Sequence, residues 1–487
     1  MRHETLLLEI GTEELPPKSL LALKTAFAEN LKKALDARQF NYSDVAAFAT
    51  PRRLAVIVTA CEDIQPEQLI QRKGPKLSAA FDSDGQPTKA LNGFLKSCGI
   101  TDPNLLEQEE TEKGAWVLYR STQAGATLSS EIQGMLIEAT ATLPIAKRMR
   151  WQRYRTEFVR PVRWLVALYG KDILDCQFHG RTAGAITYGH RAMSGDDPIT
   201  LSHADQYEAT LEAGFVIADF EKRQALINEQ LNAAASARSA IAADDPGLLE
   251  EVTALTEWPH VLSGDFDPKF LAVPEEALIS AMREHQRYFH LRDAAGQLQP
   301  SFLTVANLDS LQPEQVIAGN ERVIRPRLAD AQFFYNKDLQ KPLEDALGQL
   351  NQVVFQNELG SFGDKARRIS ALAGIIAKSL GTNHAEAARA GLLAKTDLVS
   401  LMVGEFPELQ GIMGSYYAKA QGESSLIADS IQEHYLPRFS GDQLPGTMTA
   451  CAVAIADRID TLVGLFGIGQ PPTGSKDPFA LRRQSLA

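Results

Sequence analysis

Cysteine is scarce in this chain: its 487 residues include only four, and no two of them form a CxxC pair. Such spacing indicates neither a zinc knuckle nor a disulfide framework, and scattered thiols are typical of a reducing cytoplasm. Long apolar runs are also missing, because the best candidate, Thr449–Gly469, is interrupted by Asp457, Arg458 and Asp460. We therefore expect a cytoplasmic protein with no transmembrane span and no membrane partner.

The sequence has no excess of basic residues. Lysine and arginine number 49 against 61 aspartates and glutamates, which gives a formal net charge of −12. A protein that coats nucleic acid without specificity is normally basic. Any contact with nucleic acid must therefore come from a local basic patch on an acidic body.

Familiar catalytic motifs are absent as well. There is no GxxxxGK[ST] phosphate loop, no HExxH and no GxSxG. The GxG at Gly467–Gly469 runs into Pro471 and Pro472, which would stop the helix that a dinucleotide site needs. We assign no catalytic residue, no metal ligand and no cofactor to this chain.

What the sequence does contain, 44% apolar and 23% charged residues, is typical of a globular protein. The length predicts three or four domains. We expect an α+β multidomain fold with an N-terminal mixed α/β region over residues 1–160. A second α/β region over 161–335 is either separate from the first or packed with it, and an all-helical region occupies 336–487.

Local patterns predict several elements. Apolar residues spaced by three and four after Pro16–Pro17 predict a helix, and the β-branched run Leu54–Ala60 predicts a strand. A helix is also expected over Leu128–Leu143. Gly, Pro, Asp and Ser punctuate residues 74–104, which indicates a small insert or an irregular segment. The proline start and the apolar spacing favour a helix from Pro274 through Phe289.

The sharpest local feature is the basic segment Lys147–Arg163, which contains one acid, Glu157, and interleaved aromatic residues. Guanidinium groups pair with phosphates through two hydrogen bonds and aromatic faces stack on unpaired bases, so this composition is that of an RNA-contacting surface. The alternative is a solvated basic face with its aromatic side chains turned inward. The RNA-binding candidates here are Lys147, Arg148, Arg150, Arg153, Arg155, Arg160 and Arg163.

Two further clusters offer arginines to phosphates or to an acidic partner surface. In the first of these clusters, Arg283 and Arg287 lie one turn apart on the predicted helix and share a face. Neutralisation within the fold, by Glu284 and Glu321, is an equally weighted alternative. Counting the basic segment as the first cluster, the candidates of the second cluster are Arg283 and Arg287, and those of the third are Arg322, Arg325 and Arg327.

Three carboxylates surround a glycine near the N-terminus, at Glu9, Glu13 and Glu14. Paired carboxylates perform acid–base chemistry or hold magnesium. More often, acidic residues ahead of a helix complement its dipole, and we favour that explanation here.

The helical region contains Ala394–Asp397 and Ala456–Asp460. This arrangement resembles the ground plan of HD-type metal phosphohydrolases, helical domains that use spaced His and Asp ligands. The central His-Asp pair is missing, and Lys395, placed where a metal ligand should sit, repels a divalent cation. Asp457 alone cannot hold one. We expect an HD-like shape with degenerate metal ligands and no hydrolysis.

A set of short segments follows a fixed order along the chain. The segments are Glu9–Pro16, Ala49–Leu54, Gly189–Arg191, Glu257–Pro259, Met282–Phe289, Gly319–Val323, Asp330–Phe334, Glu405–Gly411 and Asp477–Arg483. Each segment alone is a weak signal, whereas the ordered set is strong. Together they resemble the bacterial glycyl-tRNA synthetase beta subunit family over essentially the whole chain.

The resemblance implies an α2β2 aminoacyl-tRNA synthetase that joins glycine to tRNA(Gly) with ATP and magnesium. The alpha subunit is expected to carry the catalytic core and to use the ATP and magnesium, so this chain alone is expected to be non-catalytic and chiefly to bind tRNA. The resemblance also implies a phenylalanyl-synthetase-like N-terminal part. Family members continue past Asp477–Arg483 into an anticodon-binding domain, so we expect a C-terminally shortened chain.

Two other functions are alternatives to a tRNA-binding subunit. The first is an HD-type metal phosphohydrolase, against which the missing His-Asp pair argues. The second is an assembly scaffold that does not bind RNA, in which the arginines serve only the subunit interface. Salt-dependent tRNA binding separates the scaffold from the tRNA-binding subunit, because phosphate contacts release counterions.

Overall fold

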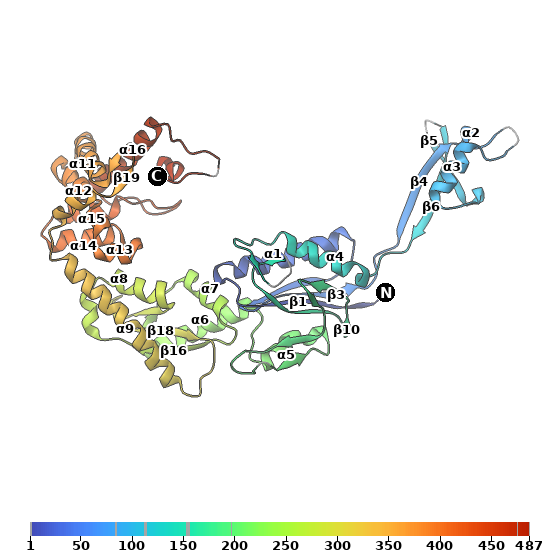
Figure 1. Ribbon diagram of the computed structural model, residues 1–487, viewed down its shortest axis with the longest axis horizontal. Coiled ribbons are helices and arrows are strands. Elements are labelled where there is room, and N and C mark those ends of the chain that lie inside the picture. The colour runs from blue at the N-terminus through green and yellow to red at the C-terminus, as the bar shows by residue number, and fades with distance from the viewer. Residues whose placement is uncertain are drawn as a thin grey trace. The chain divides into compact units, whose positions relative to one another are not determined.

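The computed structural model resolves the chain into two compact units (Figure 1). The residues that the structure describes are 2–82, 85–111, 114–151, 156–195, 197–474 and 476–486. Unit 1 comprises Met1–Gln230, Pro246–His260 and Val305–Asp309, and unit 2 comprises Leu231–Asp245, Val261–Thr304 and Ser310–Ala487. Both units contain helices and strands, so the predicted mixed α and β class is confirmed.

Unit 1 is built on a five-stranded antiparallel sheet in the order β10-β9-β1-β3-β2. Its strands are β1 (His3–Thr12), β2 (Asp44–Thr50), β3 (Arg53–Glu62), β9 (Val162–Tyr169) and β10 (Asp172–Ile173). Central strand β1 reads as a continuous apolar run because both of its faces are buried: Leu8 belongs to the core on one face and Leu7 to the core on the other. In the register, Leu8 lies opposite Val56 of β3 and Ala167 of β9.

Helices cover both faces of this sheet (Figure 1). On one face, α1 (Pro17–Ala37) and α4 (Leu128–Ala141) pack together, and α1 presents the leucines and the phenylalanine whose spacing predicted it. Pro17 suits the first helical turn because its missing N–H would have no partner there. On the other face, α5 (Tyr207–Ala213) contributes Leu211 to the core.

The described residues between 68 and 123 form a small insert with its own core. Its sheet, in the order β4-β6-β5, consists of β4 (Gln68–Lys76), β5 (Leu106–Thr111) and β6 (Gly114–Gln123), with helices α2 (Leu77–Ala80) and α3 (Lys89–Cys98). The turn-forming residues that indicated irregularity in fact delimit α3. The Thr88 hydroxyl caps it by accepting from the Leu91 N–H, and Gly99, at φ 72°, ends it.

Unit 2 contains a four-stranded sheet in the order β15-β17-β18-β16. These strands are β15 (Ile241–Ala242), β16 (His260–Asp265), β17 (Phe289–Arg292) and β18 (Leu298–Ala306). The helix predicted over Pro274–Phe289 is correct only in its first part. Helix α8 (Glu275–Ser280) continues as a π-helical turn over Ala281–His285, and Arg287, at φ 57°, turns the chain into β17.

The remainder of unit 2 is helical apart from the short hairpin β19 (Val354–Gln356) and β20 (Gly360–Ser361) among its described residues. The helices are α9 (Pro313–Asp338), α10 (Ala346–Leu350), α11 (Phe362–Ser379), α12 (His384–Leu393), α13 (Leu401–Glu405), α14 (Ile412–Ala420), α15 (Ser425–Glu433), α16 (Met448–Gly467) and α17 (Leu481–Leu486). Buried alanines such as Ala373, Ala390 and Ala452 line the core that α11, α12 and α16 share. Small side chains let these helix axes approach closely.

Strand β9, from the second predicted region, pairs with β1 from the first, so parts of both regions share the sheet of unit 1. The division of the chain at residues 160 and 335 stays a prediction. Within the described ranges, no helix combines the length and the apolar character needed to cross a bilayer.

Candidate functional site

The basic segment Lys147–Arg163 is placed at the surface of unit 1. Lys147 and Arg148 are exposed. Arg150 is also exposed, but it pairs with Glu157 across the short hairpin of β7 (Met149–Arg150) and β8 (Glu157–Phe158). The candidates Arg153 and Arg155 lie outside the described residues. Lys147 and Arg148 are therefore exposed cations of the segment that Glu157 does not engage.

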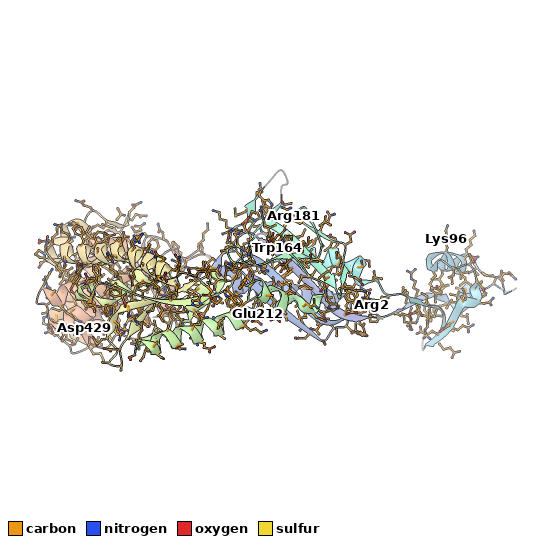
Figure 2. All side chains as sticks on the ribbon, turned by 90° about the horizontal axis from the view of Figure 1, so that it is seen from below. Arg2, Lys96, Trp164, Arg181, Glu212 and Asp429 are labelled. Atoms are coloured by element: carbon orange, nitrogen blue, oxygen red, sulfur yellow. The ribbon has the colours of Figure 1, made fainter. Side chains whose placement is uncertain are left out.

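The described aromatic residues of this segment and its neighbour Trp164 pack against the core of unit 1. Phe158 is 1% exposed and Trp151 packs against the core of unit 1. Both rings contact His179, with centroid separations of 5.5 and 5.6 Å. Trp164 (labelled in Figure 2) is 9% exposed and belongs to the core on the other face of the sheet. The alternative with inward-facing aromatics therefore holds for the buried rings of Phe158 and Trp164, whereas Trp151 is half-buried and its base-stacking role stays a prediction.

Glu13 neutralises two surface arginines. Its carboxylate lies 3.2 Å from Arg163 and 3.2 Å from Arg191, which also contacts Glu14 at 3.0 Å. Arg160, half-buried, donates to its neighbour's carbonyl at Val159 O (2.8 Å). The favoured role as a partner of a helix dipole is wrong for Glu9, which is buried in β1, and stays a prediction for Glu13 and Glu14, which precede α1.

The second cluster does not present its two arginines on one helical face. Arg283 pairs with Asp245 and Glu284. Arg287 lies beyond the end of the helix and donates to the backbone carbonyl of Glu284. The predicted shared face is therefore wrong, because the π-helical turn ends at His285.

The third cluster lies on α9. Arg322 and Arg325 are exposed, and no ion pair joins either to an acid among the described residues. Arg327 approaches Glu405 at 3.7 Å. Tyr288, next to the second cluster, donates to Oδ1 of Asn320 (2.5 Å), which lies two residues before Arg322 on α9. This side-chain contact links the segments that carry the second and third clusters within unit 2, while the first cluster belongs to unit 1.

The carboxylate of Glu9 lies at the centre of a buried network in unit 1. Glu9 is completely buried in β1 and accepts hydrogen bonds from Tyr207 Oη (2.5 Å), Thr187 Oγ1 (2.6 Å) and Trp164 Nε1. The fully buried guanidinium of Arg53 lies 3.7 Å away. A buried charge is tolerated only with a counter-charge and donors of this kind.

Arg53 connects Glu9 to a second buried carboxylate, Glu257. Arg53 approaches Glu257 Oε1 at 3.3 Å and Arg52 approaches Oε2 at 2.9 Å, while Thr50 Oγ1 donates to Oε1 at 2.8 Å. Burial raises the pKa of Glu257, but the two guanidinium groups outweigh burial and hold that pKa below its ordinary value. The segments Glu9–Pro16, Ala49–Leu54 and Glu257–Pro259 thus meet in one buried network.

Sequence reasoning missed this network because its members lie far apart in the chain, and charged residues are usually exposed. The available signal was local: Glu9 follows Leu6–Leu8, so it continues a strand that is buried on both faces. An acid within such a strand predicts a buried partner.

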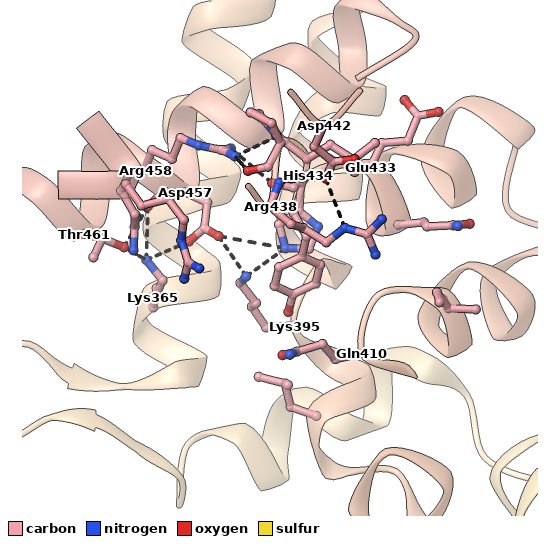
Figure 3. Close-up of a pocket in the computed structure, with 18 of the residues that line it drawn as sticks. Lys365, Lys395, Gln410, Glu433, His434, Arg438, Asp442, Asp457, Arg458 and Thr461 are labelled. Atoms are coloured by element: carbon pink, nitrogen blue, oxygen red, sulfur yellow. Dashed lines mark hydrogen bonds and ion pairs between the residues drawn. The ribbon is translucent and has the colours of Figure 1, made fainter. Parts of the chain in front are cut away.

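A second constellation surrounds a cavity of about 790 Å³ in unit 2 (Figure 3). Lys395 Nζ lies 2.8 Å from Asp457 Oδ2 and 2.7 Å from His434 Nε2. The other oxygen, Asp457 Oδ1, lies 2.7 Å from the ammonium of Lys365. The Lys395 ammonium lies between the Asp457 carboxylate and the His434 imidazole. This position agrees with the prediction that Lys395 takes the place of a metal ligand.

The electrostatics of this constellation favour a neutral imidazole and an ionised carboxylate. Burial, followed by the Lys395 ammonium, lowers the pKa of His434 to about 3. Burial also opposes ionisation of Asp457, but Lys395 and Lys365 hold its pKa well below its ordinary value. Among the described residues, no group of three or more His, Cys, Asp and Glu side chains is arranged to hold a metal ion.

Asp397, from the same sequence segment, is an isolated buried acid. Its Oδ2 accepts from the backbone N–H groups of Gly411 (2.5 Å) and Gly414 (3.0 Å), and its Oδ1 is buried without a partner. Burial raises the pKa of Asp397 to about 6, although the two amides act in the opposite direction. An ionised Asp397 therefore destabilises the folded chain.

This raised pKa predicts a pH dependence of stability. The unfolded pKa of an aspartate is about 3.9, so the cost is absent below that pH and grows as the pH rises toward and past about 6. Two pKa units correspond to about 3 kcal/mol. Between pH 4 and pH 7 we expect the wild type to lose about this much unfolding free energy relative to Asp397→Asn, measured by urea unfolding. A constant difference between the two proteins over this range would contradict the assignment.

Comparisons with known proteins identify the chain. The sequence profile described as glycyl-tRNA synthetase beta subunit matches residues 6–487. Proteins named glycine–tRNA ligase beta subunit from Hahella chejuensis, Pseudoalteromonas atlantica and Marinobacter nauticus are each 50% identical to it, over 487, 489 and 488 residues. These alignments cover 100% of this chain and 70% of each relative.

Matches of this extent show that the chain is an aminoacyl-tRNA synthetase subunit. It belongs to the glycyl-tRNA synthetase beta subunit family. The resemblance carried by the ordered segments is therefore confirmed.

Proposed function

We propose that this chain supports the ATP-dependent attachment of glycine to tRNA(Gly) by binding tRNA and a catalytic alpha subunit in a cytoplasmic α2β2 complex. The observation that carries the proposal is family membership along residues 6–487, at 50% identity to named beta subunits. ATP and magnesium are used through the alpha subunit in this proposal. A phenylalanyl-synthetase-like N-terminal part and an HD-like helical part are the domain types that we assign.

The proposed tRNA contacts are the exposed cations of the clusters. Lys147 and Arg148 in unit 1 and Arg322 and Arg325 in unit 2 are exposed, and none of the four pairs with an acid among the described residues. A cation in water keeps its donors available for a phosphate, whereas Arg150 and Arg163 must first leave a carboxylate. The four exposed cations are therefore the strongest RNA-binding candidates.

A salt titration tests these contacts. We expect the double variant Lys147→Gln/Arg148→Gln to bind tRNA(Gly) more weakly. Its slope of log affinity against log salt should be shallower by about 0.9 for each lost phosphate contact, hence by about 2 for the pair. The measurement is tRNA binding by fluorescence anisotropy from about 50 to 200 mM salt, the range over which such contacts change affinity strongly.

The matched control is Lys32→Gln/Lys33→Gln, which removes two exposed charges from α1 of the same unit, outside the three clusters. We expect its slope to equal that of the wild type. Equal slopes for both double variants would assign Lys147 and Arg148 to the solvated surface. If the wild-type chain binds tRNA without salt dependence, or not at all, the scaffold function replaces tRNA binding.

A further inference from the structure

Two of the segments that carry the family resemblance meet at the cavity of unit 2, and none of the proposed tRNA contacts lines it. Gln410 comes from Glu405–Gly411, and Phe479 and Arg483 come from Asp477–Arg483. All three residues line the 790 Å³ cavity together with Lys395 and Asp457. Small-molecule sites typically measure about 300–1,000 Å³, so this cavity has the volume of one.

One wall of the cavity is aromatic and basic. The ring of Phe355 lies 5.4 Å from Phe362 and 6.2 Å from Phe479, measured between centroids. Lys365 Nζ lies 4.7 Å from the centre of the Phe355 ring. Arg483, on α17, is exposed at this wall and has no acidic partner within 4.0 Å in the part of the chain that the structure describes. Aromatic rings and guanidinium planes of this kind stack on nucleobases.

The acids that line the cavity already have donors. Asp457 is held by two ammonium groups, and Asp442 pairs with Arg438 at 3.2 Å. Asp429 pairs with Lys419 at 2.9 Å. Glu433 accepts from the Gly446 N–H (2.7 Å), and Glu408 accepts from the Ser280 hydroxyl.

Two lining guanidinium groups are not held by these acids. Arg458 donates to the backbone carbonyls of His434, Ala454, Leu436 and Pro437 (Figure 3 shows its position beside Asp457). Arg483 is the other. The terminal N–H groups of Arg458 are thus all donated to carbonyls, so Arg483 is the lining guanidinium whose donors remain available to an anion.

Primary amides complete the lining, at Gln410, Gln432, Gln443 and Gln484. An amide offers both a donor and an acceptor, the combination that the polar edge of a nucleobase requires. We propose that this cavity binds a nucleoside monophosphate, either as a free nucleotide or as the terminal nucleotide of an RNA chain. The base would contact the wall of Phe355 and Phe479, and the phosphate would pair with Arg483.

The site binds the nucleotide without hydrolysing it. Hydrolysis at this position would need Asp457 or His434 as a base or as a metal ligand, and Lys395 engages both groups at 2.8 and 2.7 Å. No bond of the nucleotide forms or breaks in this proposal.

Binding of the four ribonucleoside 5′-monophosphates to the full chain, followed by equilibrium dialysis, tests the proposal. We expect at least one of them to bind, and we expect Arg483→Gln and Phe479→Leu each to weaken it by about fivefold or more, since a charge-assisted hydrogen bond or a stacking contact is worth at least that factor. Lys378→Gln removes an exposed cation of α11 in the same unit, which neither lines the cavity nor belongs to the RNA-binding candidates, and should leave affinity unchanged. Melting temperatures establish that the variants fold.

Competition with RNA separates the two sources of the ligand. A linear octanucleotide that displaces the bound monophosphate, while a circular RNA of the same sequence does not, identifies an RNA terminus as the ligand. Displacement by neither RNA identifies a free nucleotide. The proposal is overturned if the folded wild-type chain binds neither a monophosphate nor linear RNA. It is also overturned if Arg483→Gln and Phe479→Leu leave such binding unchanged. That result leaves tRNA binding by Lys147 and Arg148 standing, because it is measured on other residues.

Discussion

Replacing Arg53 with methionine should lower the unfolding free energy of unit 1 by about 3–5 kcal/mol, the cost of removing one partner from a buried ion pair. Arg53 is completely buried, and it is the cation that lies between Glu9 and Glu257. Without it, Glu257 keeps Arg52, but Glu9 keeps only the neutral donors around it. A buried carboxylate without a counter-charge is the main source of the expected loss.

The double variant Arg53→Met/Glu9→Gln isolates the electrostatic part of this loss. It removes the unpaired charge together with its partner, so it should lose less stability than the sum of the two single variants. Urea unfolding followed by tryptophan fluorescence reports on the site, since the Arg53 guanidinium lies 5.7 Å from the Trp164 ring. Strict additivity would show that Arg53 acts through packing alone.

The control for Arg53→Met is the same substitution at an exposed ion pair of the same unit. Arg120 lies 2.9 Å from Glu107, and the two side chains are 43% and 53% exposed. Arg120→Met should change stability by about 1 kcal/mol or less, because water screens such a pair. A loss at Arg53 no larger than at Arg120 would mean that the buried network contributes little.

Elements with a strong local pattern were predictable from the sequence. The helix α1 follows from leucines spaced by three and four behind a proline, and β3 follows from a β-branched run. The prediction of a helix over Pro274–Phe289 was wrong at its C-terminal end, because the apolar spacing continues to Phe289 although the helical backbone does not. Arg287 adopts a positive φ, and Phe289 enters a strand. The spacing of apolar residues alone does not reveal this change from helix to strand.

The candidate sites were less predictable because their chemistry depends on distant partners. The exposure of Lys147 and Arg148 agrees with the prediction of a basic surface, but the engagement of Arg163 depends on Glu13, 150 positions earlier in the chain. In unit 2, the replacement of a metal ligand by Lys395 was visible in the sequence. Its partner His434 was not, because 39 residues separate the two and only the packing of the helices brings them together.

Asp457→Asn should destabilise unit 2 by about 3–5 kcal/mol, since it leaves two buried ammonium groups with less negative charge than they need. The side chains of Lys365 and Lys395 are 3% and 5% exposed, and only Lys365 has a second acid, Asp460, at 3.1 Å. The matched control is Asp429→Asn. Asp429 lines the same cavity but pairs with Lys419 through exposed side chains, so this change should cost about 1 kcal/mol or less.

Acid should abolish the difference between wild type and Asp457→Asn. The pKa of Asp457 is held below its ordinary value by Lys395 and Lys365 despite burial. A depressed folded pKa gives stability that is fully present above the unfolded pKa of about 3.9 and is lost as the pH falls toward the folded pKa. Urea unfolding at pH 7 and at successively lower pH therefore should show the gap narrowing only below about pH 4. A gap that narrows already between pH 7 and pH 5 would mean that the ammonium groups do not hold this carboxylate ionised.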